Sequence, residues 1–118
     1  MDSWGTVYKI DGTSGDAGRI VWRMEPKQEK QEANRGVALW GNLVISVASF
    51  PARIIATNKD SGQVVWQVNA VYDQPATKVT GAPLAIGDKI FVGASGGDSG
   101  VRDWLAAFDA ASGKQLWL

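Results

Sequence analysis

A short phrase of sequence occurs twice at identical spacing and a third time in a looser form. Each copy has an Asn or Asp, then a Ser-Gly pair, then a tryptophan, and the tryptophans lie 44 and 51 residues apart. The members are Ala56, Asn58, Ser61, Gly62 and Trp66 in one copy, Ala107, Asp109, Ser112, Gly113 and Trp117 in the next, and Asp11, Ser14, Gly15 and Trp22 in the looser one. A repeat of this length predicts a blade, solenoid or array architecture.

The composition excludes several classes of site and partner. The 118 residues are 45% hydrophobic and 20% charged, as in ordinary soluble domains, and the net charge is zero without long runs of one sign. This argues against nucleic acid or an anionic membrane surface as a partner. No apolar run has the length of a transmembrane helix. The absence of cysteine and histidine excludes disulfides, thiol–metal sites, imidazole-bound zinc and Ser-His or Cys-His catalysis.

Short runs rich in valine and isoleucine, bounded by Gly, Asn and Asp, predict β-strands. Gly41-Asn42 and Gly87-Asp88 separate such runs and favour hairpins. We expect strands near Gly5–Ile10, Arg19–Met24, Gly36–Leu39, Leu43–Ala48, Arg53–Asn58, Gln63–Val68, Ala82–Ile86, Lys89–Ala94, Trp104–Asp109 and Lys114–Leu118.

Four antiparallel strands for each repeat are typical of β-propeller blades. We therefore expect an all-β, incomplete propeller that forms a single domain over residues 1–118. The end of one blade would occupy residues 1–26, a second blade 34–70 and a third blade 78–118. The repeated tryptophans would pack between neighbouring sheets, whereas Trp40 and Trp104 lie outside the phrase and could face the channel or fill a gap between blades.

The repeated phrase resembles the tryptophan-docking motif of the quinoprotein dehydrogenases, which use pyrroloquinoline quinone (PQQ) and include methanol and other alcohol dehydrogenases. Two further stretches share this resemblance. Residues 34–38, Asn-Arg-Gly-Val-Ala, are similar to the segment that leads into an inner strand beside the cofactor, and the glycine-rich residues 93–102 are similar to the loop that contacts PQQ and its metal. The resemblance implies about two and a half blades of an eight-bladed, periplasmic propeller.

The resemblance also implies cofactor-binding residues. Arg35 matches the arginine that hydrogen-bonds the quinone oxygens, and Thr80 matches a threonine that bonds a PQQ carboxylate. Ser95, Gly96 and Gly97 match the loop whose side-chain and backbone groups bind the carboxylates of the cofactor. The planar fork of an arginine suits paired oxygens. Taken singly, however, Arg35 could pair with a nearby carboxylate, Thr80 is ordinary at the start of a strand, and the glycines could form a simple turn.

Asp98 stands where these enzymes usually have a glutamate ligand to calcium or a lanthanide. A carboxylate is the right ligand type for a hard cation, although the shorter side chain retracts its oxygens, and an aspartate in a turn could also cap it. Glu29 and Lys30 occupy the two positions where many members of the family have adjacent cysteines. The chain therefore departs from the family at this point.

These features predict a fragment of a PQQ-dependent alcohol dehydrogenase, an enzyme that oxidises alcohols to aldehydes with PQQ and calcium or a lanthanide. The resemblance places the catalytic aspartate and most metal ligands in later blades, so we expect no catalytic residue here and an inactive isolated chain. The expected partners are the remaining blades or other copies of the chain, with a small alcohol as substrate of the whole enzyme. The alternative is a non-catalytic repeat module that acts as a binding scaffold or a self-assembling partial propeller.

Overall fold

The computed structural model describes residues 1–13, 15 and 17–118, so Ser14, a member of the looser copy of the phrase, lies outside the described residues. The described residues form ten β-strands and one short 3-10 helix, η1. Their bounds are β1 Val7–Asp11, β2 Arg19–Met24, β3 Ala38–Trp40, β4 Leu43–Ala48, β5 Arg53–Asn58, β6 Val64–Asn69, β7 Leu84–Ile86, β8 Lys89–Gly93, η1 Gly97–Ser99, β9 Leu105–Asp109 and β10 Gln115–Trp117. All ten predicted strands are confirmed.

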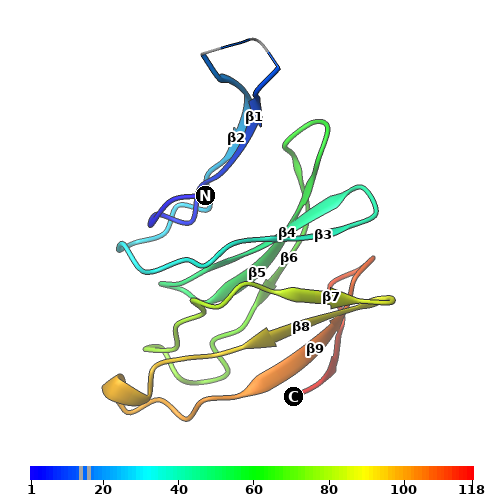
Figure 1. Ribbon diagram of the computed structural model, residues 1–118. Helices are drawn as coiled ribbons and strands as arrows, with labels where there is room; N and C mark the ends of the chain where they lie inside the picture. The colour runs from blue at the N-terminus through cyan, green and yellow to red at the C-terminus, as the bar shows by residue number, and fades with distance from the viewer. Residues whose placement is uncertain (14, 16) are drawn as a thin grey trace.

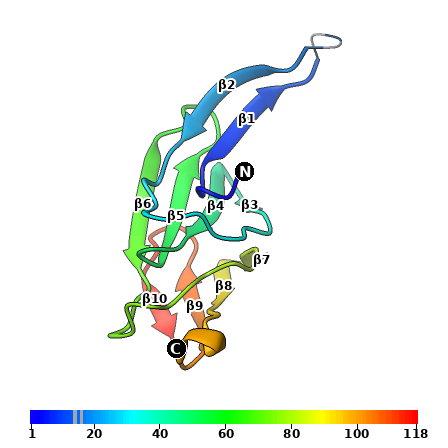
Figure 2. The same cartoon turned by 90° about the vertical axis from the view of Figure 1, so that its left-hand side faces the viewer.

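The strands form three antiparallel units in chain order (Figures 1 and 2). The N-terminal hairpin pairs β1 with β2, the middle sheet has the order β3-β4-β5-β6, and the C-terminal sheet has the order β7-β8-β9-β10. Figure 1 shows the hairpin reaching away from the two larger sheets. This is the predicted all-β, incomplete propeller, whereas the blade bounds given above stay a prediction.

Two strand starts and one turn differ from the sequence-based expectation. β3 begins at Ala38 because Gly36 has a φ of 130°, outside the range of a regular strand. β7 begins at Leu84, directly after Pro83, which has no N–H to donate to a ladder. The glycine-rich loop contains η1, which ends at Gly100 in the left-handed conformation. Such single turns are set by local backbone geometry rather than by a periodic pattern.

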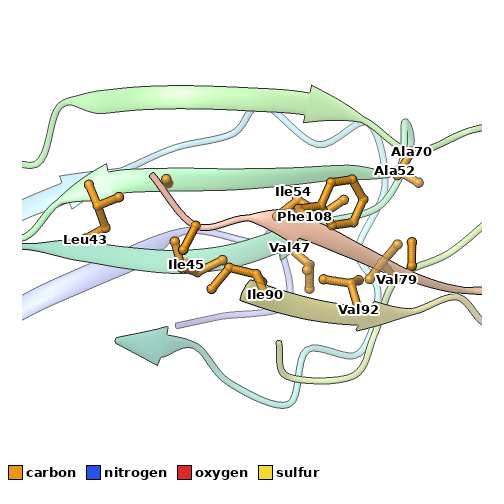
Figure 3. Packing of buried hydrophobic residues seen from close by; sticks show 13 residues of the cluster. Leu43, Ile45, Val47, Ala52, Ile54, Ala70, Val79, Ile90, Val92 and Phe108 are labelled. Carbon is orange, nitrogen blue, oxygen red and sulfur yellow. The ribbon is translucent and has the colours of Figure 1, made fainter. Parts of the chain in front are cut away.

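The main hydrophobic core fills the space between the middle and C-terminal sheets (Figure 3). β4 and β5 supply Ile45, Val47 and Ile54, and β8 and β9 supply Ile90 and Phe108; all five are fully buried. Burying a side chain of this size contributes about 1.5–3 kcal/mol. The two sheets therefore pack face to face, as expected for neighbouring blades.

β4 is buried on both faces along its whole length. Because successive side chains of a strand point to opposite faces, Ile45 and Val47 join the main core while Val44 and Ala48 pack against the N-terminal hairpin. The middle sheet is thus a layer between two neighbours. This explains why β4 is apolar on both faces, with Ser46 as its one polar residue, rather than alternating between apolar and polar.

The repeated tryptophans dock one unit onto the next. Trp22 in the hairpin donates its indole N–H to the carbonyl of Lys59 in the β5–β6 turn, at 2.9 Å. Its ring lies over Gly62, where an added Cβ would come within 2.7 Å of Cγ of the indole. Gly62 therefore provides the flat surface on which the tryptophan of the preceding unit rests.

The same contact recurs between the middle and C-terminal sheets. Trp66 donates its indole N–H to the carbonyl of Ala110 at 3.0 Å, and a Cβ at Gly113 would lie 2.5 Å from its Cε3 atom. The expectation that this tryptophan is buried between sheets is only partly right, because Trp66 is half-buried. It sits on β6, the outer strand of the middle sheet, where part of the residue remains in contact with solvent.

The two tryptophans outside the phrase also contact neighbouring segments. Trp40 donates its indole N–H to the carbonyl of Gly87 in the β7–β8 turn at 2.7 Å, so it links the middle and C-terminal sheets. Trp104 packs edge-on against Tyr72, with ring centroids 5.0 Å apart and an interplanar angle of 87°. Both therefore fill space between sheets.

Candidate functional site

The predicted site residues lie in three segments at the same end of the two larger sheets: before β3, before β7 and after β8. Arg35 is tied to Thr80 twice. Its backbone N–H donates to the carbonyl of Thr80 at 3.1 Å, and its guanidinium donates from Nη1 to Thr80 Oγ1 at 2.6 Å. The segment leading into the middle sheet is thereby fixed to the segment leading into the C-terminal sheet.

Ser95 extends this connection to the glycine-rich loop. Residues Lys78 and Ser95 form an isolated antiparallel bridge with N···O distances of 3.0 and 2.8 Å. The hydroxyl groups of Thr80 and Ser95 share a hydrogen bond at 3.3 Å. Arg35, Thr80 and Ser95 therefore form a continuous row of polar groups drawn from three separate segments.

The glycines after Ser95 have different surroundings. Gly96 has a φ of 139°, and a Cβ there would lie 3.0 Å from Cβ of Val101, so this position requires glycine. Gly97 begins η1 and is exposed, and a Cβ there would meet only Asp103, at 3.8 Å. Asp98 is also exposed. The turn presents this carboxylate to solvent beside the polar row.

A cavity of about 240 Å³ lies over the row. Its lining residues are Glu32, Ala33, Arg35, Lys78, Thr80, Ser95, Gly96 and Asp98. The structure thus brings together all the predicted site residues except Gly97, which is in the adjoining turn but not in the lining. It also adds two charged residues that the sequence analysis missed. Lys78 could have been found from its position two residues before Thr80, whereas no sequence signal marks Glu32.

Opposite charges meet at this cavity. Lys78 Nζ lies 3.0 Å from Oε2 of Glu32, and Glu32 Oε1 accepts the backbone N–H of Ala33 at 3.0 Å. The Ala33 N–H, and then the Lys78 ammonium, hold the pKa of the Glu32 carboxyl below its ordinary value. Arg35, by contrast, makes no ion pair among the described residues. Its remaining guanidinium donors are available to a ligand with anionic oxygens.

A complete metal site is not present in the part of the chain that the structure describes. No group of three or more acidic, cysteine or histidine side chains is close enough there to hold an ion. Calcium prefers six to eight oxygen ligands. Asp98 could therefore supply one carboxylate to a metal that takes its other ligands from elsewhere.

A second cavity of about 720 Å³ adjoins the first, because Lys78 lines both. This second cavity is lined by Glu29 and Lys30 together with Phe50. Glu29 and Lys30 stand at the two positions where, by the family resemblance, adjacent cysteines are common. The Lys30 ammonium lies 5.2 Å from the centroid of the Phe50 ring, a cation–π distance. The two positions thus carry a charged, exposed pair in place of a disulfide.

Residues 3–118 match the family model PQQ_2, described as Outer membrane protein assembly factor BamB. The chain belongs to the PQQ_2 family. This member is 34% identical, over 98% of its length, to the quinohemoprotein alcohol dehydrogenase ADH IIB of Pseudomonas putida, and it covers 17% of that enzyme. The resemblance to quinoprotein dehydrogenases inferred from the sequence is confirmed.

Solved structures agree with this assignment. The fold superposes on a europium-containing methanol dehydrogenase with a TM-score of 0.83 and 30% identity, covering 95% of this chain and 20% of that one. BamB from Moraxella catarrhalis gives a TM-score of 0.55 at 18% identity, covering 97% of this chain and 46% of that one, a likeness of fold alone. This PQQ_2 member spans about a fifth of the length of the dehydrogenases that it matches. Among the residues that the structure describes, no helix is long and apolar enough to cross a membrane.

Proposed function

We propose that this chain supplies one side of the PQQ- and metal-binding site of a quinoprotein alcohol dehydrogenase. The observation that carries the proposal is the polar row of Arg35, Thr80 and Ser95, which three separate segments assemble beside an open cavity. Each of these residues matches a PQQ-binding position of the quinoprotein dehydrogenases. Their convergence in space is independent of that match and supports it.

The residues present fit a planar tricarboxylate. The guanidinium of Arg35 carries a fixed positive charge and forked donors for a pair of oxygens, while Thr80 and Ser95 offer hydroxyl groups along the same rim. Gly96 and Gly97 would let the backbone approach the ligand, and Asp98 would give one oxygen ligand to calcium or a lanthanide. The chemistry that bound PQQ supplies is the two-electron oxidation of an alcohol, for which the protein provides binding and orientation.

The remaining parts of the activity would come from outside this chain. A single carboxylate cannot complete a calcium or lanthanide site, and a cavity of about 240 Å³ that is open to solvent cannot enclose a planar ligand on both faces. We infer that further blades supply the other metal ligands and the catalytic residue. The whole enzyme would act on a small alcohol in the periplasm.

Titration with PQQ and calcium, followed by equilibrium dialysis and by backbone amide spectra of the labelled chain, tests this proposal. We expect a Kd no tighter than about 0.1 mM, or about −5.5 kcal/mol, with amide shifts in the segments around Arg35, Thr80 and Ser95. The isolated chain should show no dye-linked alcohol oxidation. Asp98→Ala should remove any calcium dependence of PQQ binding.

Arg35→Ala should abolish the PQQ-dependent shifts, because it removes the guanidinium that is hydrogen-bonded to Thr80 in the polar row. Arg23→Ala is the matched control, since Arg23 pairs with Glu25 in the N-terminal hairpin at 3.1 Å and lies outside the site. PQQ binding that responds equally to both substitutions would refute the proposed site. Micromolar binding or measurable turnover would show that this chain carries far more of the site than one side.

A scaffold or self-assembling module is the second candidate. The description of the matching family model, Outer membrane protein assembly factor BamB, favours it. So do the exposed apolar side chains of β3 and β7, among them Leu39 and Ile86. Concentration-dependent assembly without PQQ binding sensitive to Arg35→Ala would support this candidate over the dehydrogenase site.

A further inference from the structure

Lys78 belongs to the same row of side chains as two of the proposed cofactor ligands. Side chains two residues apart in an extended segment share a face, so Lys78 and Thr80 lie on one side while Val79, 1% exposed, points into the core. The bridge between Lys78 and Ser95 places these two residues directly opposite each other. Lys78, Thr80 and Ser95 all line the 240 Å³ cavity.

The ammonium group of Lys78 is held at the edge of this cavity by Glu32. The Nζ–Oε2 distance is 3.0 Å, and the two side chains are 30% and 22% exposed. The Glu32 carboxylate is fixed more firmly than the Lys78 ammonium, because its Oε1 also accepts the Ala33 N–H at 3.0 Å. A lysine has three donors on a flexible stem, whereas this ion pair uses one of them. Lys78 can therefore leave Glu32 by rotating its side chain.

The charges around the cavity favour such a movement when an anionic ligand enters. Arg35 and Lys78 carry the positive charges of the lining, and Glu32 and Asp98 carry the negative ones. A ligand carboxylate near Arg35 would be repelled by Glu32 and attracted by Lys78. A partly exposed ion pair contributes little to stability, so exchanging Glu32 for a ligand carboxylate costs little.

We propose that Lys78 is a specificity-determining residue of this site. When the cofactor binds, the Lys78 ammonium leaves Glu32 and forms an ion pair with a carboxylate of the cofactor. This inference rests on the proposed function, because the carboxylates concerned are those of PQQ. Glu32 then acts as a competing anion that holds Lys78 at the rim when the site is empty. Ligands without a carboxylate would gain nothing from Lys78.

The exchange is tested by two substitutions that should change the affinity for PQQ in opposite directions. Lys78→Met keeps the length of the side chain but removes its charge, and it should weaken PQQ binding about two- to fivefold. Glu32→Gln removes the competing anion, and it should tighten PQQ binding by a similar factor. Lys114→Met, in the β9–β10 turn at the other end of the C-terminal sheet, is the matched control and should leave the Kd unchanged.

PQQ trimethyl ester provides the second arm, since its carboxyl groups carry no charge. Its affinity should be unaffected by Lys78→Met and Glu32→Gln. If the ion pair serves only to tie the two segments together, both substitutions break the same contact and should weaken PQQ binding alike. That result, or an equal response of the ester, would overturn the role of Lys78 while leaving a site sensitive to Arg35→Ala intact. Absence of any PQQ binding sensitive to Arg35→Ala would overturn the proposed function and this inference together.

Discussion

Replacing Gly113 by alanine should measure how strongly the tryptophan contact joins the two larger sheets. Gly113 has a φ of 76°, and the added Cβ would lie 2.5 Å from Cε3 and 2.7 Å from Cδ2 of Trp66. The backbone conformation alone costs about 1–2 kcal/mol for a residue with a Cβ. Forcing the indole away adds an overpacking cost of about 1–3 kcal/mol. We therefore expect Gly113→Ala to lower the free energy of unfolding by about 2–5 kcal/mol.

Gly87→Ala separates the two costs. Gly87 has a φ of 61° and no atom within 4 Å of an added Cβ, so it bears the backbone cost without the clash. Urea unfolding followed by circular dichroism should show a loss of about 1–2 kcal/mol for this control. In a Trp66→Ala background, the cost of Gly113→Ala should fall toward this value, because the clashing ring is gone and only the contact with Val68 Cγ2 at 3.0 Å remains. Equal losses for the two glycines in the wild-type background would refute the docking argument.

Three further expectations concern packing, pH and association. Trp66→Ala should lower the free energy of unfolding in urea by about 2–3 kcal/mol. This is less than the roughly 3–5 kcal/mol typical of a large core aromatic, because Trp66 is only half-buried. A loss under about 1 kcal/mol would contradict this expectation. Because the folded pKa of Glu32 lies below its ordinary value of 4.5, its stabilising contribution is present above pH 4.5 and is lost as the pH falls through the folded pKa. The stability difference between wild type and Glu32→Gln should therefore shrink on acidification, and a difference that does not change with pH would argue against it. Exposed apolar side chains also lie on β3 and β7, where Leu39, Leu84 and Ile86 are 69%, 56% and 57% exposed. Light scattering should therefore detect dimers or larger species at micromolar concentration. A monomer at every concentration would contradict this expectation.

Much of the fold could be predicted from local sequence. The ten strands follow from short apolar runs bounded by turn residues, and the period of the Ser-Gly and tryptophan phrase identifies the repeat. The site residues Arg35, Thr80, Ser95 and Asp98 were found through a resemblance carried by short motifs. β3 and β7 begin two residues later than the sequence predicts, because Gly36 and Pro83 interrupt regular strand pairing. Pairing depends on backbone dihedral angles and N–H donors, which a hydrophobic pattern does not reveal.

The tertiary structure alone decided which residues meet. Glu32 and Lys78 lie far apart along the chain, and nothing in their local patterns predicts a 3.0 Å ion pair. The pair forms because the Arg35–Thr80 hydrogen bonds bring their two segments together. The half-burial of Trp66 likewise depends on its place on an outer strand. Strand periodicity and turn chemistry are properties of neighbours in sequence, so the sequence by itself determined the elements and their repeat. Distances between charges and the exposure of a ring depend on how the sheets pack, which only the folded chain specifies.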